Sequence, residues 1–529
     1  MNKFPGVYSP APMARIPIGD DMEQKTKITK DIQKTKEYVK DKLQVPRHFG
    51  LVFREFQIRF QDGWVEAFLC YFDGMSDTTF INRDILRNLL QNGVPESLSA
   101  PREETIFEKL TPLGPLSKAL DFGTALEALY FGNCIFFADG CACAFLADVK
   151  NWRGRGVGEP TQEASLSGPQ EAFNEVIMTN MALVRKILKT PDLMAENIPV
   201  GTVSKTPCAL MYLQGVTNEK LVAEVRRRLE GIDTSYIFST GDVEMMIEDT
   251  TYFPMTHTLK TERPDRTAAM LAEGKVAVIV QGSPFALILP STAADLIEAS
   301  EDNYVRVPEA NFMRLIRLAG MTLSLLLPGL FTAIMLYHHE VIPTDLLLAI
   351  EASREKVPFP LLAELLLMEL AFELIKEASV RVPSPIGSTL GIIGGLILGQ
   401  AAVEANIVSP ILIIIVSIAG LGTFATPSAS FARSLSLMRF VFILFGALAG
   451  MLGIVCAGFM VGGLLTASES YGVPFLSPFA PKNGDSVWGT LLVKPIWKKE
   501  LRPRSLRTHS PRVQPHISRK WKQEKEDTL

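Results

Sequence analysis

The sequence predicts an α/β region made of two similar lobes, followed by an α-helical polytopic transmembrane region. Three observations predict this fold class. Apolar runs of strand length alternate with helical patterns from residue 48 to about residue 300. Landmarks of this alternation recur later in the same region, which indicates an internal duplication. Beyond Pro308, uncharged apolar runs of 18 residues or more follow one another, as in membrane helices.

The composition excludes several classes of protein. The 529 residues are too many for one hydrophobic core, and about three or four units are expected. With 47% hydrophobic and 21% charged residues, the chain is neither disordered nor embedded in a membrane throughout. The net charge of −4 argues against nucleic acid as a partner, and six cysteines are too few for a disulfide scaffold. We expect those cysteines to be buried thiols rather than metal ligands.

Residues 1–47 are expected to form an N-terminal tail and a solvated helix. Residues 1–21 contain no apolar run of signal-peptide length, so the N-terminus is expected to stay in the cytoplasm. Between residues 23 and 44, a few apolar side chains recur at helical spacing in an otherwise polar stretch. This pattern predicts a helix with one buried edge.

The two α/β lobes are expected at residues 48–155 and 199–307, with a helical connector at residues 156–198 between them. Each lobe has a Tyr-x-x-Gly after an apolar run and a later hairpin with glycine at its turn. Glycine provides the positive φ that such turns need. The matching landmarks are Tyr71 and Gly74 with Tyr212 and Gly215, and Asp139-Gly140 with Gln281-Gly282.

The membrane region is expected at residues 308–467. The segment at residues 361–380 has the length of a crossing but carries five charged side chains. Because charges are costly at the centre of a bilayer, we expect it to be an amphipathic or re-entrant helix. Four uncharged runs are long enough to cross a bilayer: residues 318–337, 386–403, 407–425 and 440–466.

The tail at residues 468–529 is basic and predicts the topology. Residues 494–529 contain eleven Lys or Arg and four acidic residues, so the positive-inside rule places the C-terminus in the cytoplasm. With the lobes on the same side, the number of crossings must be even, and four crossings satisfy this. That arrangement leaves Arg433 and Arg439 outside; five crossings would bring them inside but would export the basic tail.

Two features of the membrane region are candidate functional sites. One is a glycine at every fourth position, which favours a subunit contact, a pore wall or packing within the chain: Gly387, Gly391, Gly395 and Gly399. The other is the charged face of segment 361–380, which is suited to an ion path or a subunit interface: Glu369, Glu373, Lys376 and Glu377. The alternative for this face is a Glu373–Lys376 pair on an interfacial helix.

No motif for catalysis, cofactor binding or metal binding occurs in the sequence. We therefore expect no enzyme activity, no cofactor and no metal. The basic tail is expected to contact anionic lipid or to aid solubility, rather than to bind nucleic acid.

Several longer strings are similar to those of one known family. They are EPTQEASLSGPQEAF (159–173), TERPDR (261–266), GKVAVIVQGSPFALILP (274–290), SEDNYVR (300–306), IPTDLLLAIEASREKVPFP (342–360), IKEASVRVPSPIG (375–387), GQAAVEANIVSP (399–410) and YGVPFLSPFAP (471–481). With these strings, the chain resembles the GerA family of spore germination proteins, the A subunits of nutrient germinant receptors, over most of its length. It departs from the family pattern, which usually has Arg, Arg and Gly, at Ser167, Gln170 and Ala172.

This resemblance implies a multi-pass subunit of a receptor in the inner membrane of bacterial spores, with B and C subunits as partners. It also implies a homo-oligomer of channel-like character that triggers germination and ion release, while the B subunit mainly recognises the nutrient. A secondary transporter and a non-conducting membrane scaffold are the alternatives. A transporter is disfavoured because the repeat lies in the α/β region and not among the membrane helices.

Overall fold

The structure is a computed structural model in which the chain divides into two compact units. The first unit is Met1–Arg153 with Leu188–Pro191, and the second is Gly154–Ile187 with Asp192–Leu529. The described residues are 27–60, 63–92, 102–110, 116–150, 160, 163, 167–250, 254–381, 399–482, 484 and 486–515.

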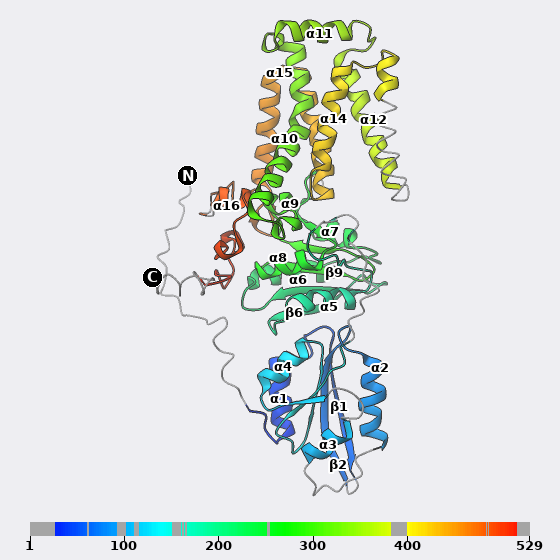
Figure 1. Cartoon of the computed structure of the whole chain (residues 1–529), viewed down its shortest axis with the longest axis vertical. Helices are drawn as coiled ribbons and strands as arrows, with labels where there is room; N and C mark the ends of the chain where they lie inside the picture. Colours follow the sequence, from blue (N-terminus) through cyan, green and yellow to red (C-terminus); the bar gives the residue numbers. More distant parts are fainter. Residues whose placement is uncertain are drawn as a thin grey trace. The chain divides into compact units, whose positions relative to one another are not determined.

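The first unit is an α/β lobe with one antiparallel sheet (Figure 1). Its strands have the spatial order β1-β2-β4-β5-β3. The hairpin between β4 and β5 contains Gly140 at a φ of 83°, as the Asp139-Gly140 pattern predicted. The elements are α1 (Ile32–Lys42), β1 (Leu51–Phe60), β2 (Gly63–Phe72), α2 (Thr78–Phe80), η2 (Ile81–Leu86), η3 (Asn88–Asn92), α3 (Arg102–Leu110), β3 (Leu116–Ala119), α4 (Phe122–Tyr130), β4 (Cys134–Ala138) and β5 (Ala144–Ala147).

The second unit begins with a lobe of the same topology. Its sheet has the order β6-β7-β9-β10-β8, which matches the first sheet strand for strand. The duplication predicted from the sequence is therefore present in the fold. The elements are α5 (Ile177–Ile187), β6 (Leu193–Val200), β7 (Thr206–Leu213), α6 (Glu219–Glu230), α7 (Thr240–Ile247), β8 (Leu259–Thr261), α8 (Pro264–Ala272), β9 (Val276–Val280), β10 (Ala286–Leu289), α9 (Ala293–Ile297) and η5 (Ser300–Asn303).

The boundary of this second lobe differs from the sequence-based expectation. β6 begins at Leu193, inside the stretch 156–198 that was expected to be a helical connector. The strand pairs with β7 along its whole length, from Leu193 opposite Leu213 to Val200 opposite Thr206. Its first three side chains are all buried, so it lacks the alternation by which a half-exposed strand is identified in a sequence.

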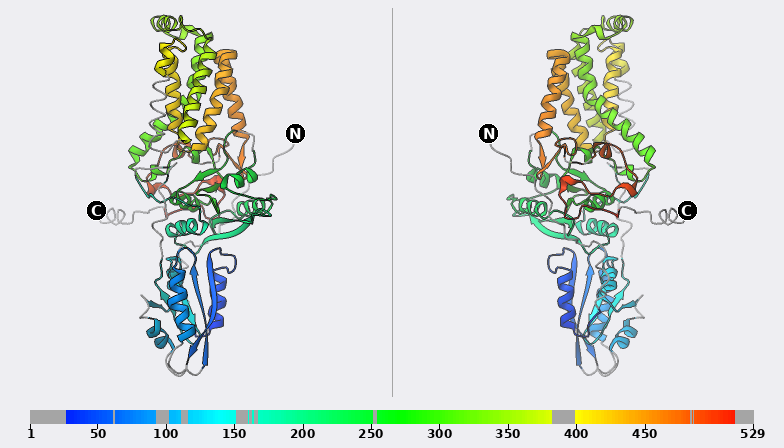
Figure 2. Two further views of the ribbon diagram at one scale, coloured as in Figure 1. Left: turned by 90° about the vertical axis from the view of Figure 1, so that its right-hand side faces the viewer. Right: turned by 90° about the vertical axis from the view of Figure 1, so that its left-hand side faces the viewer.

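Helices follow the second lobe (Figures 1 and 2). Two of them, α10 and α15, are long and apolar enough to cross a membrane, and α14 is apolar but has 15 residues. Much of the run 386–403 lies outside the described residues, so four crossings are not confirmed. The elements are α10 (Val307–Tyr337), η6 (His339–Val341), α11 (Thr344–Arg354), α12 (Leu361–Arg381), α14 (Pro410–Phe424) and α15 (Ala429–Ala467).

α15 is a helical hairpin and not one straight helix. Its backbone leaves the helical region at Ala449 (φ −140°, ψ 17°) and Gly450 (φ 59°, ψ −138°). A Cβ added at Gly453 would collide with the carbonyl oxygen of Phe445, although eight residues of continuous helix would separate the two by about 12 Å. The chain therefore reverses at Gly450. The run 440–466, which was expected to be a single crossing, contains this reversal, because only glycine readily adopts the φ of the turn.

The turn of the hairpin lies at the far end of α10. The hydroxyl of Tyr337, the last residue of α10, donates to the carbonyl oxygens of Ala447 at 2.9 Å and Leu448 at 3.0 Å. The two legs, 429–448 and 451–467, thus run towards and away from that end. α15 consequently returns the chain to the lobe from which α10 departs.

The segment after α15 packs on the second lobe. The Ser470 hydroxyl donates to the His257 carbonyl at 2.8 Å, the Ala293 N–H to the Phe475 carbonyl at 2.8 Å, and the Arg502 Nε to the Ala272 carbonyl at 2.8 Å. Both ends of the helical region are therefore attached to the same lobe. The elements of this segment are β11 (Glu469–Ser470), β12 (Val473–Pro474), α16 (Val487–Leu491), η7 (Ile496–Lys498) and η8 (Arg504–Leu506).

Candidate functional site: two buried ionic networks

The charged face predicted on α12 contains one fully buried acid. Glu369 lies 2.6 Å from Arg439 of α15, measured from Oε2 to Nη1, and the side chains are 0% and 1% exposed. Both groups sit between helices whose other side chains are mostly apolar. A charge in such a place is costly unless it is paired and hydrogen-bonded, so this pair is the central feature of the helical region.

The remaining donors of Arg439 join three further positions to the pair. Its Nε donates to the Ser324 carbonyl of α10 at 2.8 Å, and its Nη2 donates to the Ser324 hydroxyl at 2.8 Å and the Thr423 hydroxyl of α14 at 2.6 Å. Nη2 also reaches the Ala419 carbonyl at 3.4 Å. One guanidinium therefore connects α10, α12, α14 and α15. We call Glu369, Arg439, Ser324 and Thr423 the membrane network.

Close helix contacts make this arrangement possible. A Cβ on Gly422 of α14 would collide with the carbonyl oxygen of Gly320 of α10, and a Cβ on Gly446 of α15 would lie 2.6 Å from the carbonyl oxygen of Gly329.

Of the predicted glycine row, Gly387, Gly391 and Gly395 lie outside the described residues. Gly399 is described, and a Cβ there would lie 3.7 Å from Cγ2 of Ile413 in α14.

The other members of the predicted face are less buried than Glu369. The Lys376 Nζ lies 3.4 Å from Oε2 of Glu373, with side chains 18% and 30% exposed, and it also reaches the Ser436 hydroxyl at 3.2 Å. Glu377 is exposed. The Glu373–Lys376 pair considered as an alternative is thus present, and Glu369 has a separate partner on α15.

A fourth acid of α12, Glu364, has partners of its own outside this face. Oε1 of Glu364 accepts from the Ser409 N–H at 2.5 Å and from the Ser409 hydroxyl at 2.7 Å. Its Oε2 lies 3.6 Å from Nε of Arg354 in α11. Since Ser409 precedes the first turn of α14, the Glu364 carboxylate is at the N-terminus of that helix, where negative charge is stabilised.

The sequence analysis did not identify Arg439 as the partner of Glu369, because the arrangement with four membrane crossings left Arg439 outside the membrane. The signal that could have identified Arg439 is the need of a buried Glu369 for a cation beside it. Glu369 has apolar neighbours on both sides in the sequence LMELAF. Segments 361–381 and 429–467 form the helices that carry these two residues.

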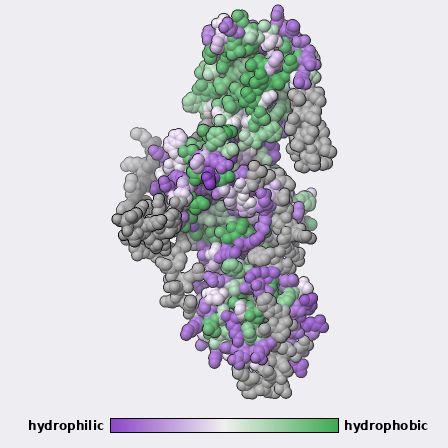
Figure 3. Space-filling model, viewed as in Figure 1, coloured by the Kyte–Doolittle hydropathy of each residue, from purple (hydrophilic) through white to green (hydrophobic). Residues whose placement is uncertain are grey.

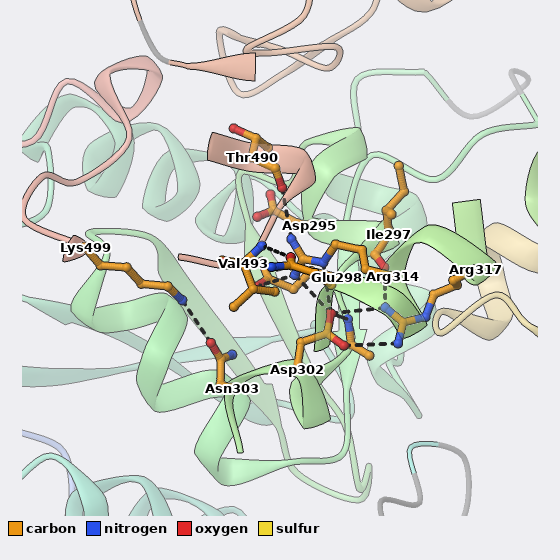
Figure 4. A network of polar contacts seen from close by, with 12 residues as sticks. Asp295, Ile297, Glu298, Asp302, Asn303, Arg314, Arg317, Thr490, Val493 and Lys499 are labelled. Atoms are coloured by element: carbon orange, nitrogen blue, oxygen red, sulfur yellow. Dashed lines mark hydrogen bonds and ion pairs between the residues drawn. The ribbon is translucent and has the colours of Figure 1, made fainter. Parts of the chain in front are cut away.

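A second network joins the lobe to the start of α10 (Figure 4). Oδ2 of the buried Asp302 accepts from Arg314 Nε at 3.1 Å and Nη2 at 3.0 Å, and from Arg317 Nη1 at 3.1 Å. Arg314 also bonds Oε1 of Glu298 at 3.0 Å and the carbonyl of Thr490 at 3.0 Å. Asp302 therefore links η5 to α10, while Arg314 links α10 to the C-terminal segment. We call Asp302, Arg314, Arg317 and Glu298 the junction network.

Buried ion pairs of the lobe extend the junction network. Arg266 donates to the carbonyls of Asp295 and Glu298 at 2.8 Å and lies 2.5 Å from Oε1 of Glu163. The Asp295 carboxylate lies 2.5 Å from Nζ of Lys275. Burial alone would raise the pKa of Asp295, but Lys275 and hydrogen bonds from Thr292 outweigh it and hold the pKa below its usual value.

Two of the family-like segments, TERPDR (261–266) and SEDNYVR (300–306), are in contact in the structure. The contact is made by Arg263, Asp265 and Tyr304. Arg263 is 0% exposed and pairs with Asp265 at 3.0 Å, and the Tyr304 hydroxyl donates to Oδ2 of Asp265 at 2.6 Å. Burial and the Asp265 carboxylate raise the pKa of the Tyr304 phenol. The strings thus meet in one structural network between the lobe and α10.

Neither network has the chemistry of a metal centre or a nucleophile. Among the described residues, no group of three or more His, Cys, Asp or Glu could hold a metal ion. Five of the six cysteines are buried thiols, as expected, but the expectation is wrong for Cys456, which is exposed. Burial raises the pKa of Cys134 to about 12, which keeps that thiol protonated and unreactive. The two networks instead connect α10 to the second lobe and to the neighbouring helices.

Comparisons with known proteins identify relatives over most of the chain. A family model described as Bacillus/Clostridium GerA spore germination protein matches residues 37–505. Spore germination protein KA of Bacillus subtilis is 37% identical over 471 residues, which are 89% of this chain and 86% of that protein. Spore germination protein GerLA of Bacillus cereus is 34% identical over 415 residues, which are 78% of this chain and 83% of that protein.

One solved structure is also similar. It is the crystal structure of the N-terminal domain of the A subunit of the Bacillus megaterium spore germinant receptor GerK3. It is 30% identical in sequence, covers 50% of this chain and 97% of its own length, and has a TM-score of 0.38.

Proposed function

Because the chain belongs to the GerA family of spore germination proteins, we propose that it is the A subunit of a nutrient germinant receptor in the inner membrane of the spore. In this proposal it acts with B and C subunits and forms a homo-oligomer of channel-like character. Nutrient binding elsewhere in the receptor then triggers ion release and germination. The observation that carries the proposal is the Glu369–Arg439 pair, a buried charge pair inside apolar helices, because such groups usually serve function.

The surface of the helical region supports its placement in a membrane. Figure 3 shows it as largely hydrophobic, with hydrophilic side chains gathered around α11 at its end. At 1.5 Å per residue, the two legs of α15 are about 25–30 Å long, close to the thickness of the hydrocarbon core. α10, which has 31 residues, is longer. These three segments are proposed to cross the bilayer as part of an even number of crossings.

The charges at the two ends of the helices support the orientation. Arg306, Arg314 and Arg317 lie at the start of α10, beside the basic C-terminal segment, whereas Glu340 and Asp345 lie near its far end. In the proposed orientation the second lobe and both termini face the cytoplasm, which is the side that the positive-inside rule favours for basic residues. The attachment of the C-terminal segment to the lobe requires the same side for both.

A mechanism follows from the positions of the two networks on one helix. Arg314 of the junction network and Ser324 of the membrane network are ten residues apart on α10, a rise of about 15 Å. A movement of the lobe that shifts Asp302 is carried along α10 to Arg439. We propose that this weakens the hold of Arg439 on Glu369 and presents the acid face of α12 to an ion path.

The test is ion release from spores that depend on this chain and its B and C subunits. Glu369→Gln and Glu373→Gln are expected to slow nutrient-triggered release of monovalent cations at least tenfold. Glu309→Gln, which changes an exposed acid at the start of α10, is the control and should germinate as the wild type. Thermal unfolding in detergent shows whether each variant is folded, and Glu373→Gln, the milder change, is informative even where Glu369→Gln fails to fold.

Conductance of the purified oligomer in planar bilayers is the second measurement. Cation conductance that is altered by Glu373→Gln agrees with the proposal. An oligomer that purifies with B and C subunits but conducts no ions would show a non-conducting scaffold instead.

A further inference from the structure

The segment 486–499, which follows the helical region, exposes large apolar side chains to an unusual degree. Trp488 is 72% exposed and Ile496 is 67% exposed, and Leu492 and Trp497 are also exposed. Soluble surfaces seldom gather aromatic and aliphatic side chains in so short a stretch. Two exposed lysines, Lys494 and Lys498, lie among them.

This segment is fixed beside the start of α10. The Val493 N–H donates to Oδ1 of Asn311 at 2.7 Å, and the Asn311 amide donates back to the Val493 carbonyl at 3.3 Å. Arg314 holds the Thr490 carbonyl at 3.0 Å. Figure 4 shows Thr490 and Val493 next to Arg314, and in Figure 1 α16 lies at the foot of α10.

The first turns of α10 expose apolar side chains near the same place. Phe312 is 60% exposed and Leu315 is 63% exposed, and Met313 and Ile316 are exposed as well. They precede Leu318, where the uncharged run of α10 begins. Segment 486–499 is thus held beside the point where α10 enters its proposed membrane crossing.

We propose that residues 486–499 form an interfacial anchor that lies in the headgroup layer of an anionic phospholipid bilayer on the side of the second lobe. The rings of Trp488 and Trp497 and the side chains of Leu492 and Ile496 enter the boundary between headgroups and acyl chains, where tryptophan is enriched. Lys494 and Lys498 contact lipid phosphates, since basic groups near a membrane surface are attracted to anionic lipid. This inference rests on the proposed membrane location of α10.

The anchor has a consequence for the junction network. Segment 486–499 touches α10 at Asn311 and Arg314, and Arg314 holds Asp302. An anchored segment therefore holds the junction network at a fixed depth relative to the bilayer. A force on the second lobe then acts on α10 and does not move the whole unit relative to the membrane.

Fluorescence quenching by brominated lipid tests the anchor in the full chain. The chain has five tryptophans, so a variant that keeps only Trp488 is made by replacing the others with phenylalanine. Reconstituted in vesicles of dibromo-phosphatidylglycerol, it is expected to lose at least half of its fluorescence, and more with bromine near the headgroup than near the chain end. A variant that keeps only Trp64, exposed in the first lobe, should not be quenched.

A third reporter separates failure of the anchor from failure of the membrane proposal. In this variant all five natural tryptophans are replaced with phenylalanine, and Leu323→Trp introduces one tryptophan at an exposed position of α10. Its fluorescence should be quenched most by lipid that carries bromine near the end of the acyl chain. Quenching there without quenching at Trp488 overturns the anchor alone. Absence of quenching at both positions overturns the membrane location as well.

The lysines are tested by the preference for anionic lipid. The double variant Lys494→Gln with Lys498→Gln is expected to reduce the quenching of Trp488 in phosphatidylglycerol to the level in brominated phosphatidylcholine. The pair Lys205→Gln with Lys220→Gln, exposed on the second lobe, keeps the preference. Equal quenching in both lipids for the unmodified segment overturns the role of the lysines. Protection of Trp488 only after B and C subunits are added identifies a protein partner and overturns the anchor.

Discussion

Arg439 and Glu369 are 70 residues apart in the chain and are joined by a 2.6 Å contact that is sealed from solvent. The acid belongs to α12 and the base to the first leg of α15. Both would be costly to bury alone, and together with Ser324 and Thr423 they satisfy most of their hydrogen-bonding groups. Because of this pair, the packing of α12 depends on the position of α15, and the helical region has a polar contact at its core.

Removal of one partner of this pair should destabilise the helical region strongly. Arg439→Met leaves the Glu369 carboxylate buried without its cation, and we expect a loss of about 3–5 kcal/mol in unfolding free energy. The double variant Arg439→Met with Glu369→Leu should recover most of that loss. Thermal unfolding in detergent measures both. Arg433→Gln, on the exposed side of the same helix, is the control, and an equal loss there would show that the burial of Arg439 is unimportant.

Close packing of α10 and α14 should be sensitive to a single methyl group. Gly422→Ala adds a Cβ that meets the Gly320 carbonyl, and we expect a loss of about 1–3 kcal/mol from overpacking. Gly458→Ala is the matched control because no atom lies within 4 Å of its Cβ position. Its melting temperature should stay the same or rise slightly. Equal melting temperatures for both variants would contradict the observed helix contact.

The junction network should keep the connection between the second lobe and α10 rigid. Asp302→Asn removes the anion that Arg314 and Arg317 share, and we expect a loss of about 3 kcal/mol. Hydrogen exchange should become faster in residues 298–317 and in residues 486–499, because Arg314 contacts both segments. Exchange that speeds up only around Asp302 itself would mean that the C-terminal segment is held independently. Glu309→Gln serves as the control.

His257 should make attachment of the C-terminal segment sensitive to acid. Burial lowers the pKa of His257 below its ordinary value of 6.5, against a weaker opposite effect of Asp249. The folded lobe therefore favours the neutral ring, so stability is complete above pH 6.5 and declines as the pH falls below it. The ring packs on Phe475 with centroids 5.1 Å apart.

Limited proteolysis of the C-terminal segment at pH 7.5 and pH 5 measures this effect. Cleavage should be several-fold faster at pH 5 in the wild type. His257→Phe, which cannot titrate, should show a smaller ratio between the two pH values. The same ratio in both proteins would exclude His257 as the cause.

Much of the α/β region could be predicted from local patterns. The hairpin glycines Gly140 and Gly282 were identified because positive φ restricts the residue type. β6 was missed because its conformation depends on pairing with β7. In the helical region, the uniformly apolar run 440–466 indicated how long the apolar segment is but not the direction in which the chain travels. The reversal at Gly450 could therefore not be predicted from the sequence.

The sequence by itself determined the duplicated α/β lobes, the change to apolar helices after Pro308 and the concentration of charge on segment 361–380. These features depend on residue types and spacings that act over a few turns or strands. The tertiary structure alone decided that Glu369 faces Arg439, that Asp302 holds Arg314 and that the C-terminal segment returns to the second lobe. Such pairings join residues far apart in the chain, and only packing, which fixes which charges share a buried volume, can select them.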